Sequence, residues 1–445
     1  MIKIKLIHSF KKNINDFFLY LNLIFIYLLV SKYANFLEPF EDEITSLISG
    51  VSFLQNLNFN GSPLIEGNYS PYLTSGPIAS IGSGFGWILT KNFVFARIFN
   101  FYFLVLLIYF LLKLSEIFKN NSRFFNLNLI LISLTLLPWW FGSLYSLGEM
   151  FSSALFVVSI LIINSHKNLA FFIMGFSIIF GKLIQILLVV PFIFIYLLST
   201  KKLSFINIFN LLLPFLIYIS LIFFKTENFN FVDYFTSYLS IIYNHQSSGL
   251  KINGFFNLQN ILNQLNSSEF IQWSLITKVR VFITPLIFIF ILYSERKKID
   301  KLLNSSYAII FSILTPYLWF LFLSQTKWIR YSQHFLFLII FFSLIILFSE
   351  IELSSISVLV LLFNISLFLS SELVLILFLC TLFKRKDSGL FKKLILIVLV
   401  LNTLNLLIES QNLTEYDLNL ESCKNSLTSM KCVEDYLPYN FFNNT

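Results

Sequence analysis

Charged residues are scarce in this sequence. Of its 445 residues only 12% are Asp, Glu, Lys or Arg, whereas 57% are hydrophobic. This composition excludes a soluble enzyme, because no soluble core could bury so many apolar runs of about 15 to 20 residues, each of which matches one bilayer crossing. The net charge of +8 does not indicate nucleic acid binding here, since Lys and Arg lie mainly between the apolar runs. We therefore expect an integral membrane protein that contacts membrane lipids and no nucleic acid.

Several catalytic motifs are also missing. The four His are scattered, and the three Cys lack the paired spacing of a zinc site. The run from Gly82 to Gly86 has no Lys of a phosphate-binding loop, and no Gly-x-Ser-x-Gly elbow of a hydrolase occurs. Cys423 and Cys432 lie in the polar C-terminal tail and can form a disulfide if the tail lies in an oxidising compartment. With these motifs absent, the remaining type of chemistry is one in which carboxylates act next to a phosphate group of the substrate.

The basic residues predict the topology. Lys residues before the first apolar run place the N-terminus in the cytoplasm, and the loop 37–92 then lies outside, since it carries acidic residues and no Lys or Arg before Lys91. The basic residues just before the last apolar run are predicted to lie inside, so the C-terminal tail 409–445 is predicted to be external. The predicted crossings are about 17–36, 93–113, 126–145, 150–164, two short ones within 168–199 that meet at Gly181-Lys182, then 204–224, 275–293, 305–323, 335–349, 353–370, 371–383 and 393–408.

Four carboxylates follow the first crossing within one short stretch: Glu38, Glu41, Asp42 and Glu43. A solvated loop that helps to fix topology could contain such a cluster, and so could the polar end of a reaction site at the membrane surface. We favour the reaction site, because the rest of the chain supplies fitting partners on the same side. Glu149, in the next external turn, adds a further carboxylate.

Basic residues that this topology puts on the acidic outer side, at or near helix ends, include Lys182, Lys327 and Arg330. Basic residues are usually kept inside, so cations at the outer ends of helices indicate an anionic partner. Snorkelling to lipid headgroups is the alternative. A lipid-phosphate-linked sugar fits these groups: cations hold the departing phosphate, and a carboxylate orients an acceptor hydroxyl and removes its proton.

Four stretches resemble the GT-C superfamily of multi-spanning glycosyltransferases, close to the bacterial protein-mannosyltransferase-like and aminoarabinose-transferase-like enzymes. Together they cover roughly residues 36–335 in matching order. They are Asp42-Glu43 after the first crossing, Tyr69-Ser70-Pro71-Tyr72 to Pro77, Ala96-Arg97 at the start of the second crossing, and Lys327-Trp328-Ile329-Arg330-Tyr331.

The resemblance implies an inverting transfer from a polyprenyl-phosphate-linked sugar to a lipid, glycan or protein acceptor. It implies that Asp42 is the catalytic base, with Glu43 beside it. Because Glu41, Asp42 and Glu43 are adjacent, the choice of the base among these three stays open. It also implies that Glu149, where the family more often has Asp, supports the acceptor or a metal. If the site uses a divalent cation, Mg or Mn, Asp42 and Glu149 would hold it.

The matching stretches add Tyr69, Arg97 and Tyr331 to the substrate-binding candidates, although Arg97 fits snorkelling or pairing with the loop equally well. His245 and His334 are interpreted as having no role in the chemistry.

We therefore expect an all-α polytopic protein of the bacterial inner membrane. Its bundle would be GT-C-like, with about 11–13 transmembrane helices, a helical first external loop and an active site on the outer face. Residues 1–408 would form one transmembrane module, with a second external segment at 225–272 and the external tail at 409–445.

Two other functions remain open. A flippase or transporter for a lipid-linked saccharide would need charges inside the bilayer or paired broken helices, which the sequence does not indicate. An O-antigen-type polymerase or ligase would be favoured if the segment 225–272 carried the function.

Overall fold

The computed structural model describes most of the membrane-type segments of the chain. The described residues are 28, 30–35, 41–57, 77–118, 122–135, 143–145, 148–200, 204–225, 230–233, 235–236, 275–303, 307–324, 329–366, 373, 376 and 388–411. Within these ranges every regular element is a helix. The expected all-α fold is therefore confirmed.

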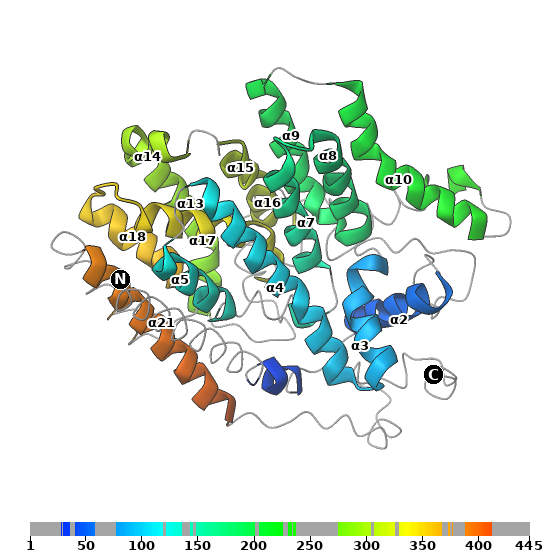
Figure 1. Cartoon of the computed structure of the whole chain (residues 1–445), viewed down its shortest axis with the longest axis horizontal. Coiled ribbons are helices and arrows are strands. Elements are labelled where there is room, and N and C mark those ends of the chain that lie inside the picture. The colour runs from blue at the N-terminus through cyan, green and yellow to red at the C-terminus, as the bar shows by residue number, and fades with distance from the viewer. Residues whose placement is uncertain are drawn as a thin grey trace, which may run out of the picture.

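Most of the described helices are shorter than one bilayer crossing (Figure 1). The elements are α2 Glu41–Asn56, η1 Pro77–Ser80, α3 Ile81–Thr90, α4 Phe93–Ile117, α5 Arg123–Thr135, α7 Glu149–Ile162, α8 Lys167–Phe176, η2 Ser177–Gly181, η3 Leu183–Gln185, α9 Ile186–Thr200, α10 Phe205–Lys225, α13 Leu275–Ser294, α14 Arg296–Leu303, α15 Tyr307–Ser312, α16 Leu314–Leu318, η5 Trp319–Leu323, η6 Ile329–Ser332, α17 Gln333–Phe348, α18 Ser355–Ile365 and α21 Ser388–Gln411.

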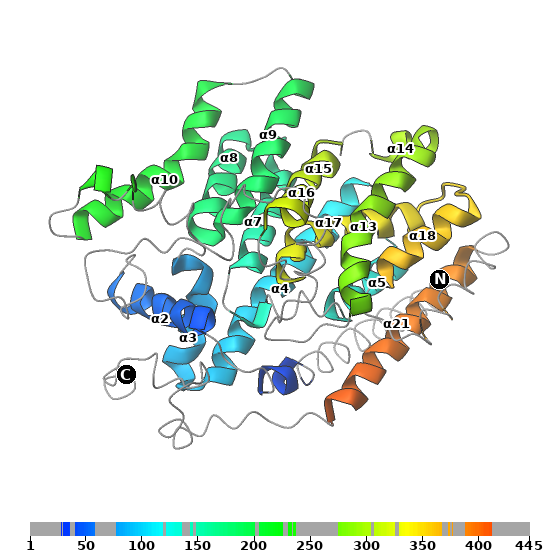
Figure 2. The ribbon, with the colours of Figure 1, turned by 180° about the vertical axis from the view of Figure 1, so that it is seen from behind.

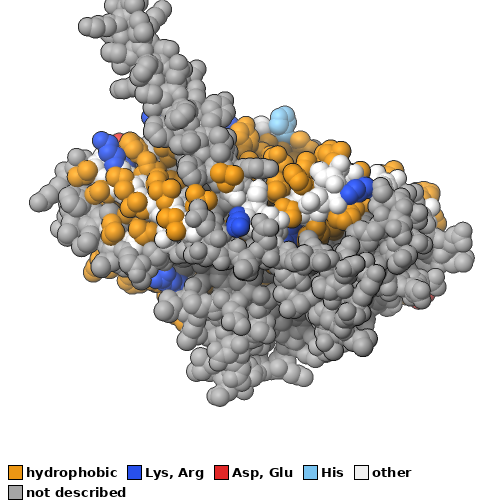
Figure 3. Space-filling model, turned by 90° about the horizontal axis from the view of Figure 1, so that it is seen from below, with side chains coloured by type: hydrophobic (Ala, Val, Ile, Leu, Met, Phe, Trp, Pro, Cys, Tyr) orange, Lys and Arg blue, Asp and Glu red, His pale blue; other side chains and the backbone are white. Residues whose placement is uncertain are grey.

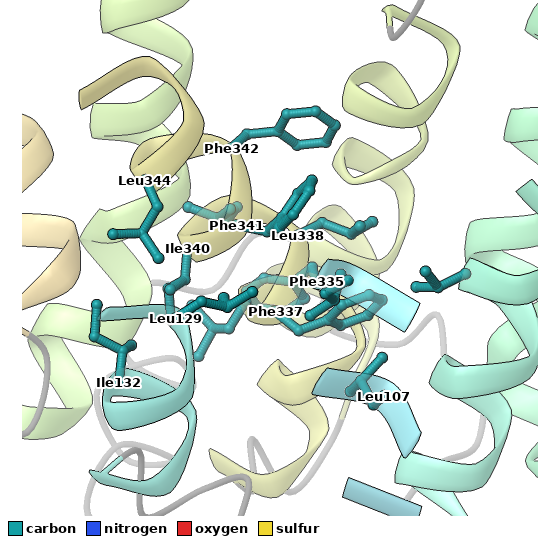
Figure 4. Close-up of a cluster of buried hydrophobic side chains, with 14 of the residues drawn as sticks. Leu107, Leu129, Ile132, Phe335, Phe337, Leu338, Ile340, Phe341, Phe342 and Leu344 are labelled. Atoms are coloured by element: carbon teal, nitrogen blue, oxygen red, sulfur yellow. The ribbon is translucent and has the colours of Figure 1, made fainter. Parts of the chain in front are cut away.

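Helix α17 forms the centre of the bundle. All of its residues are buried, as a helix that is apolar on every side requires. Figure 4 shows its Phe335, Phe337 and Phe341 among side chains of neighbouring helices, including Leu129 of α5 and Leu107 of α4. The core thus surrounds α17, whose first residues Gln333 and His334 are polar. Packing of α17 in the core fixes the position of these two residues.

Helices α2 and α3 form a separate layer at one end of the bundle, as both views of the ribbon show (Figures 1 and 2). The expectation that the segment 37–92 is helical is confirmed in its described residues by these two helices and by the 3-10 turn η1; its external position stays a prediction. Helix α3 also packs on α4. The side chain of Asn92 caps α4 by accepting hydrogen bonds from the N–H groups of Val94 and Phe95, at 2.8 and 3.3 Å.

Two helices are interrupted in the same way. Helix α8 passes into the π-helical turn η2, an extended residue at Lys182 and the 3-10 turn η3. Helix α16 passes into the π-helical turn η5 and an extended residue at Ser324, and the 3-10 turn η6 then leads into α17. π-helical turns are rare and frequently mark functional sites.

The outer surface carries many large apolar side chains. Phe205 and Phe224 of α10 are 83% and 81% exposed, and hydrophobic side chains predominate among the coloured atoms in Figure 3. By length and composition, Phe93–Ile117 and Gly389–Ile408 can cross a membrane, and ten shorter apolar helices accompany them in the described residues. Helix α4 is about 37 Å long, enough for a hydrocarbon core of about 30 Å. Such exposed apolar faces are what a bilayer covers.

Candidate functional site

A carboxylate and an ammonium group meet inside the bundle. Glu149 is the first residue of α7 and is 0% exposed, and its Oε1 lies 3.5 Å from Nζ of Lys182, whose side chain is 8% exposed. Glu149 lies at the N-terminus of α7, where the helix dipole stabilises a negative charge. Lys182 follows the last carbonyls of α8 and η2, at a C-terminal helix end that stabilises a positive charge. The two sequence candidates are therefore brought together.

Two glycines allow this approach. Gly148 precedes Glu149 with φ of +83°, a left-handed conformation that glycine adopts without strain. A Cβ at Gly181 would lie 2.2 Å from Oγ of Ser152 in α7, so only a residue without a side chain lets the end of η2 touch α7. The Lys182 backbone, which follows Gly181 directly, is thereby held against the start of α7.

The start of α17 brings a further polar group to this region. Nδ1 of His334 in α17 lies 3.0 Å from Oε1 of Gln185 in η3. Both residues are fully buried, and Lys182 is near enough to His334 to act on it electrostatically. Gln185 and Lys182 belong to the same turn, with the N–H of Gln185 donating to the Lys182 carbonyl at 2.9 Å, so the start of α17 lies against the break between α8 and α9.

Several of these buried polar atoms have no hydrogen-bond partner among the described residues. They include both carboxylate oxygens of Glu149, both amide atoms of Gln333, Nε2 of His334 and Nε2 of Gln185. Buried polar groups are almost always hydrogen-bonded, and each unmade bond costs about 1–3 kcal/mol. We call Glu149, Lys182, Gln185, Gln333 and His334 the buried polar cluster; its vacant donors and acceptors fit a polar ligand or ordered water.

A second ion pair fixes the helical first loop to the bundle. Arg97 in α4 donates to both oxygens of Glu43 in α2, at 2.6 and 2.7 Å, and to the carbonyl of Ala34 at 2.7 Å. Its guanidinium also lies over the rings of Phe93 and Tyr145, 4.6 and 5.4 Å from their centres. Burial raises the pKa of Glu43, and the Arg97 charge opposes this. Three donors of Arg97 and both carboxylate oxygens of Glu43 are engaged within the protein, so we interpret this pair as structural.

The other predicted residues divide into two groups. Asp42 precedes Glu43 in α2, Tyr331 lies in η6 with its ring 5.6 Å from that of Trp319, and Arg330 lies in η6. The side chains of Asp42 and Arg330 are outside the described part. Tyr69, Lys327, Cys423 and Cys432 lie outside the described residues altogether, as does most of the segment 225–272.

The first loop nevertheless reaches the buried polar cluster. Ala79 of η1 would touch a Cβ at Gly148, at 2.7 Å, and η1 contacts η2. The loop that carries the acidic motif therefore packs against the end of α7 that carries Glu149. This juxtaposition places the backbone of the acidic motif and the Glu149–Lys182 pair at the same end of the bundle.

Sequence reasoning missed Gln185, Gln333 and His334. Each of them is a polar residue beside a long apolar run, which could have drawn attention to it. A single polar residue in such a place, however, is more often a packing residue than part of a binding site. For a metal, the described residues contain no group of three His, Cys, Asp or Glu. A divalent cation shared by Asp42 and Glu149 stays a prediction.

Within the described residues the fold is all-helical, with exposed apolar helices around a buried acid–lysine pair at the break between α8 and α9. The sequence matches no protein-family model, and no curated protein matches it. Among solved structures, the chain is similar to the crystal structure of ArnT from Cupriavidus metallidurans in the apo state. The identity is 13% and the TM-score 0.43, over 87% of this chain and 76% of that chain. A similarity of this size assigns no activity.

Proposed function

We propose that this chain is a glycosyltransferase of the bacterial inner membrane that takes a sugar from a polyprenyl-phosphate donor on the outer face. The observation that carries the proposal is the buried pair of Glu149 and Lys182, whose surroundings hold vacant hydrogen-bonding atoms. A buried charge destabilises the fold unless it is fully paired, so buried charges in membrane proteins usually serve a function such as ligand binding. A sugar phosphate supplies both an anion for the lysine and hydroxyl groups for the vacant acceptors.

The chemistry is a single displacement. An acceptor hydroxyl attacks the sugar carbon that bears the phosphate, the carbon–oxygen bond to the phosphate breaks, and the polyprenyl phosphate leaves with the bonding electrons. A carboxylate takes the acceptor proton, and inversion at that carbon follows. In this scheme Lys182 stabilises the charge on the departing phosphate, with Lys327 and Arg330 as further cations.

The roles of the carboxylates follow from their positions. Glu43 is engaged by Arg97 on both oxygens, which leaves Asp42 as the better base of that pair. Glu149 has vacant oxygens beside Lys182, so it is suited to orient the acceptor. The acceptor class, whether lipid, glycan or protein, is part of the proposal and rests on the resemblance.

The test is transfer in proteoliposomes supplied with a polyprenyl-phosphate-linked sugar and a cell-envelope lipid extract as acceptor. We expect Asp42→Asn and Glu149→Gln each to lower the rate by about 100-fold or more, as the loss of a proton acceptor does. Lys182→Met should abolish the stabilisation that polyprenyl phosphate gives against thermal unfolding. The matched control is Glu116→Gln, which removes an exposed carboxylate paired with Lys113 at 2.9 Å. Transfer at the normal rate in both carboxylate variants would overturn the proposal.

One observation favours a second function, the movement of a lipid-linked saccharide across the membrane. Paired broken helices with charges between them are a feature of transporters, and the described residues contain π-helical breaks at η2 and η5, the first of which is followed by the buried Lys182. The same proteoliposomes separate the two functions. A transporter moves labelled donor across the bilayer with its sugar–phosphate bond intact, whereas a transferase releases polyprenyl phosphate.

A further inference from the structure

An apolar groove lies between α13 on one side and α15 and α16 on the other. Its volume is about 360 Å³, within the range of about 300–1,000 Å³ typical of small-molecule pockets. Leu292 of α13, Ile310 of α15 and Tyr317 of α16 line it, together with Ile339 of the central helix α17. The phenol of Tyr317 donates to the Phe282 carbonyl at 2.8 Å, so the groove presents an almost wholly apolar lining.

The groove opens toward the outside of the bundle. Of its lining residues, Tyr293 is 78% exposed, Phe311 51% and Ile289 37%. In a membrane these side chains face lipid and not water. Whatever enters the groove therefore comes from the bilayer.

One end of the groove is basic. Arg296, the first residue of α14, lines it, and Lys297 and Lys298 follow on the exposed side of the same helix. The opposite side of α14 is buried through Ile299 and Leu303. A short helix with a buried apolar side and an exposed cationic side lies at the membrane surface, and clustered basic residues there attract anionic headgroups.

We propose that this groove is a binding site for an anionic membrane phospholipid, with one acyl chain in the groove and the phosphate at Arg296. The competing contact of Arg296 is weak: its Nε lies 3.7 Å from Asp300, and both side chains are exposed. Asp300 also accepts from the phenol of Tyr307, which leaves the guanidinium able to turn to a phosphate. The complementarity of charge selects an anionic headgroup over a zwitterionic one.

This site is separate from the proposed reaction. Both ribbon views place α14 at the opposite end of the bundle from α2 and α3 (Figures 1 and 2), and η1 beside α3 packs on the end of α7 that carries Glu149. The groove is therefore distinct from the sugar-donor site, and its occupant is a structural or regulatory lipid.

The test is native mass spectrometry of the purified full chain with phosphatidylglycerol or phosphatidylcholine of identical acyl chains. We expect tighter binding of phosphatidylglycerol by at least about fivefold, a preference that Arg296→Gln removes. Ile289→Trp, a change at the half-exposed rim that the fold tolerates, should weaken binding of both lipids by filling the groove. Arg123→Gln is the control, because Arg123 is an exposed basic residue at the start of another helix, α5.

Each outcome bears on the proposal. Equal binding of both lipids, or a loss of preference in Arg123→Gln equal to that in Arg296→Gln, would overturn it, because charge at Arg296 would then not select the lipid. Displacement of bound phosphatidylglycerol by polyprenyl phosphate, with loss of sugar transfer in Ile289→Trp, would overturn it in another way by assigning the groove to the donor. Normal transfer in Ile289→Trp with weakened phospholipid binding supports it.

Discussion

The pair of Glu43 and Arg97 shows how a single residue in the first loop depends on one in the bundle. The two side chains are 1% and 2% exposed, and the guanidinium reaches both carboxylate oxygens and a backbone carbonyl. A bidentate arginine–carboxylate contact in a dry setting is among the stronger polar contacts a protein makes. Removing one partner leaves the other charge buried alone, which costs more than the pair contributes.

We therefore predict that Glu43→Gln destabilises the protein by about 3–5 kcal/mol, the usual cost of breaking a buried pair. Thermal unfolding of the purified protein in detergent measures this as a lower midpoint. The exposed pair of Lys113 and Glu116 supplies the comparison, because Glu116→Gln should change stability by less than about 1 kcal/mol. Similar midpoints for the two variants would mean that the Glu43 pair contributes no more than a surface contact.

At this scale the sequence predicted part of the site. It identified Lys182 from a charge that interrupts an apolar run and Glu149 from its predicted external turn and the resemblance, and the structure brings the two together. It named Arg97 as a substrate-binding candidate with loop pairing as an equal alternative, and the structure shows the pairing. It could not separate Asp42 from Glu43, since adjacent carboxylates look alike in a sequence; only the position of Arg97 in space distinguishes them.

At the scale of elements, one carboxylate joins three helices. Glu295 lies between α13 and α14, accepts hydrogen bonds from the N–H of Ser354 and the hydroxyl of Ser357, and pairs with Lys298 at 3.0 Å. Burial raises the pKa of Glu295, but these hydrogen bonds and the lysine outweigh burial and lower it to about 2. The bonds between the start of α18 and Glu295 at the end of α13 are thus strongest while Glu295 is ionised.

This gives a prediction for pH. The folded pKa of about 2 lies below the ordinary value of 4.5, so the ionised form stabilises the fold fully above pH 4.5, and the gain is lost as the pH falls toward 2. Glu295→Gln should therefore lower the unfolding midpoint at pH 7, and the difference from the unchanged protein should shrink between pH 4.5 and 2. Denaturation followed by circular dichroism across this range measures it. A difference that stays constant over that range would mean that the charge of Glu295 does not matter.

The interrupted helix at η2 allows a second element-scale prediction. A methyl group at Gly181 would meet Ser152 of α7 at 2.2 Å, so Gly181→Ala should push η2 from α7 and draw Lys182 away from Glu149. We expect sugar transfer to fall by at least about tenfold, a change that corresponds to about 1.4 kcal/mol. Gly82→Ala, where the nearest atom is at 3.1 Å, is the matched control. Rescue of Gly181→Ala by Ser152→Gly, which makes room for the methyl group, would confirm that the contact is the cause.

The elements themselves were largely predictable. Apolar runs gave the starts of α4, α10 and α13 to within a residue or two, at about 93, 204 and 275, because hydrophobicity and length decide where a membrane helix lies. The sequence predicted an interruption at Gly181-Lys182, where η2 ends and Lys182 is extended, but not the one at η5. The π-helical form of both turns could not be predicted, because no sequence pattern distinguishes such a turn from a continuous helix. The contact between His334 and Gln185 joins residues far apart in the chain and appears only in the structure.

For the molecule as a whole, the decisive property is its orientation in the membrane. The structure places α2, α3 and the Glu149 end of α7 together, and α14 at the other end (Figures 1 and 2). The cationic residues of α14 lie in a predicted cytoplasmic turn, as positively charged loops do. If this holds, the buried polar cluster is close to the outer surface, where a lipid-linked sugar donor is expected to be used.

Labelling from outside intact cells tests this orientation directly. In a chain with Cys380, Cys423 and Cys432 replaced by Ser, a membrane-impermeant maleimide should react with Thr90→Cys, at the exposed end of α3. It should react with Lys297→Cys in α14 only after the membrane is opened. The charge distribution requires this result, since moving the basic turn across the bilayer would oppose the membrane potential by about 2.3 kcal/mol per charge at 100 mV. The reverse pattern would put Glu149 and Lys182 near the cytoplasm. A donor presented on the outer face could not then reach them, and the proposed transfer would have to be abandoned even if every carboxylate variant proved inactive.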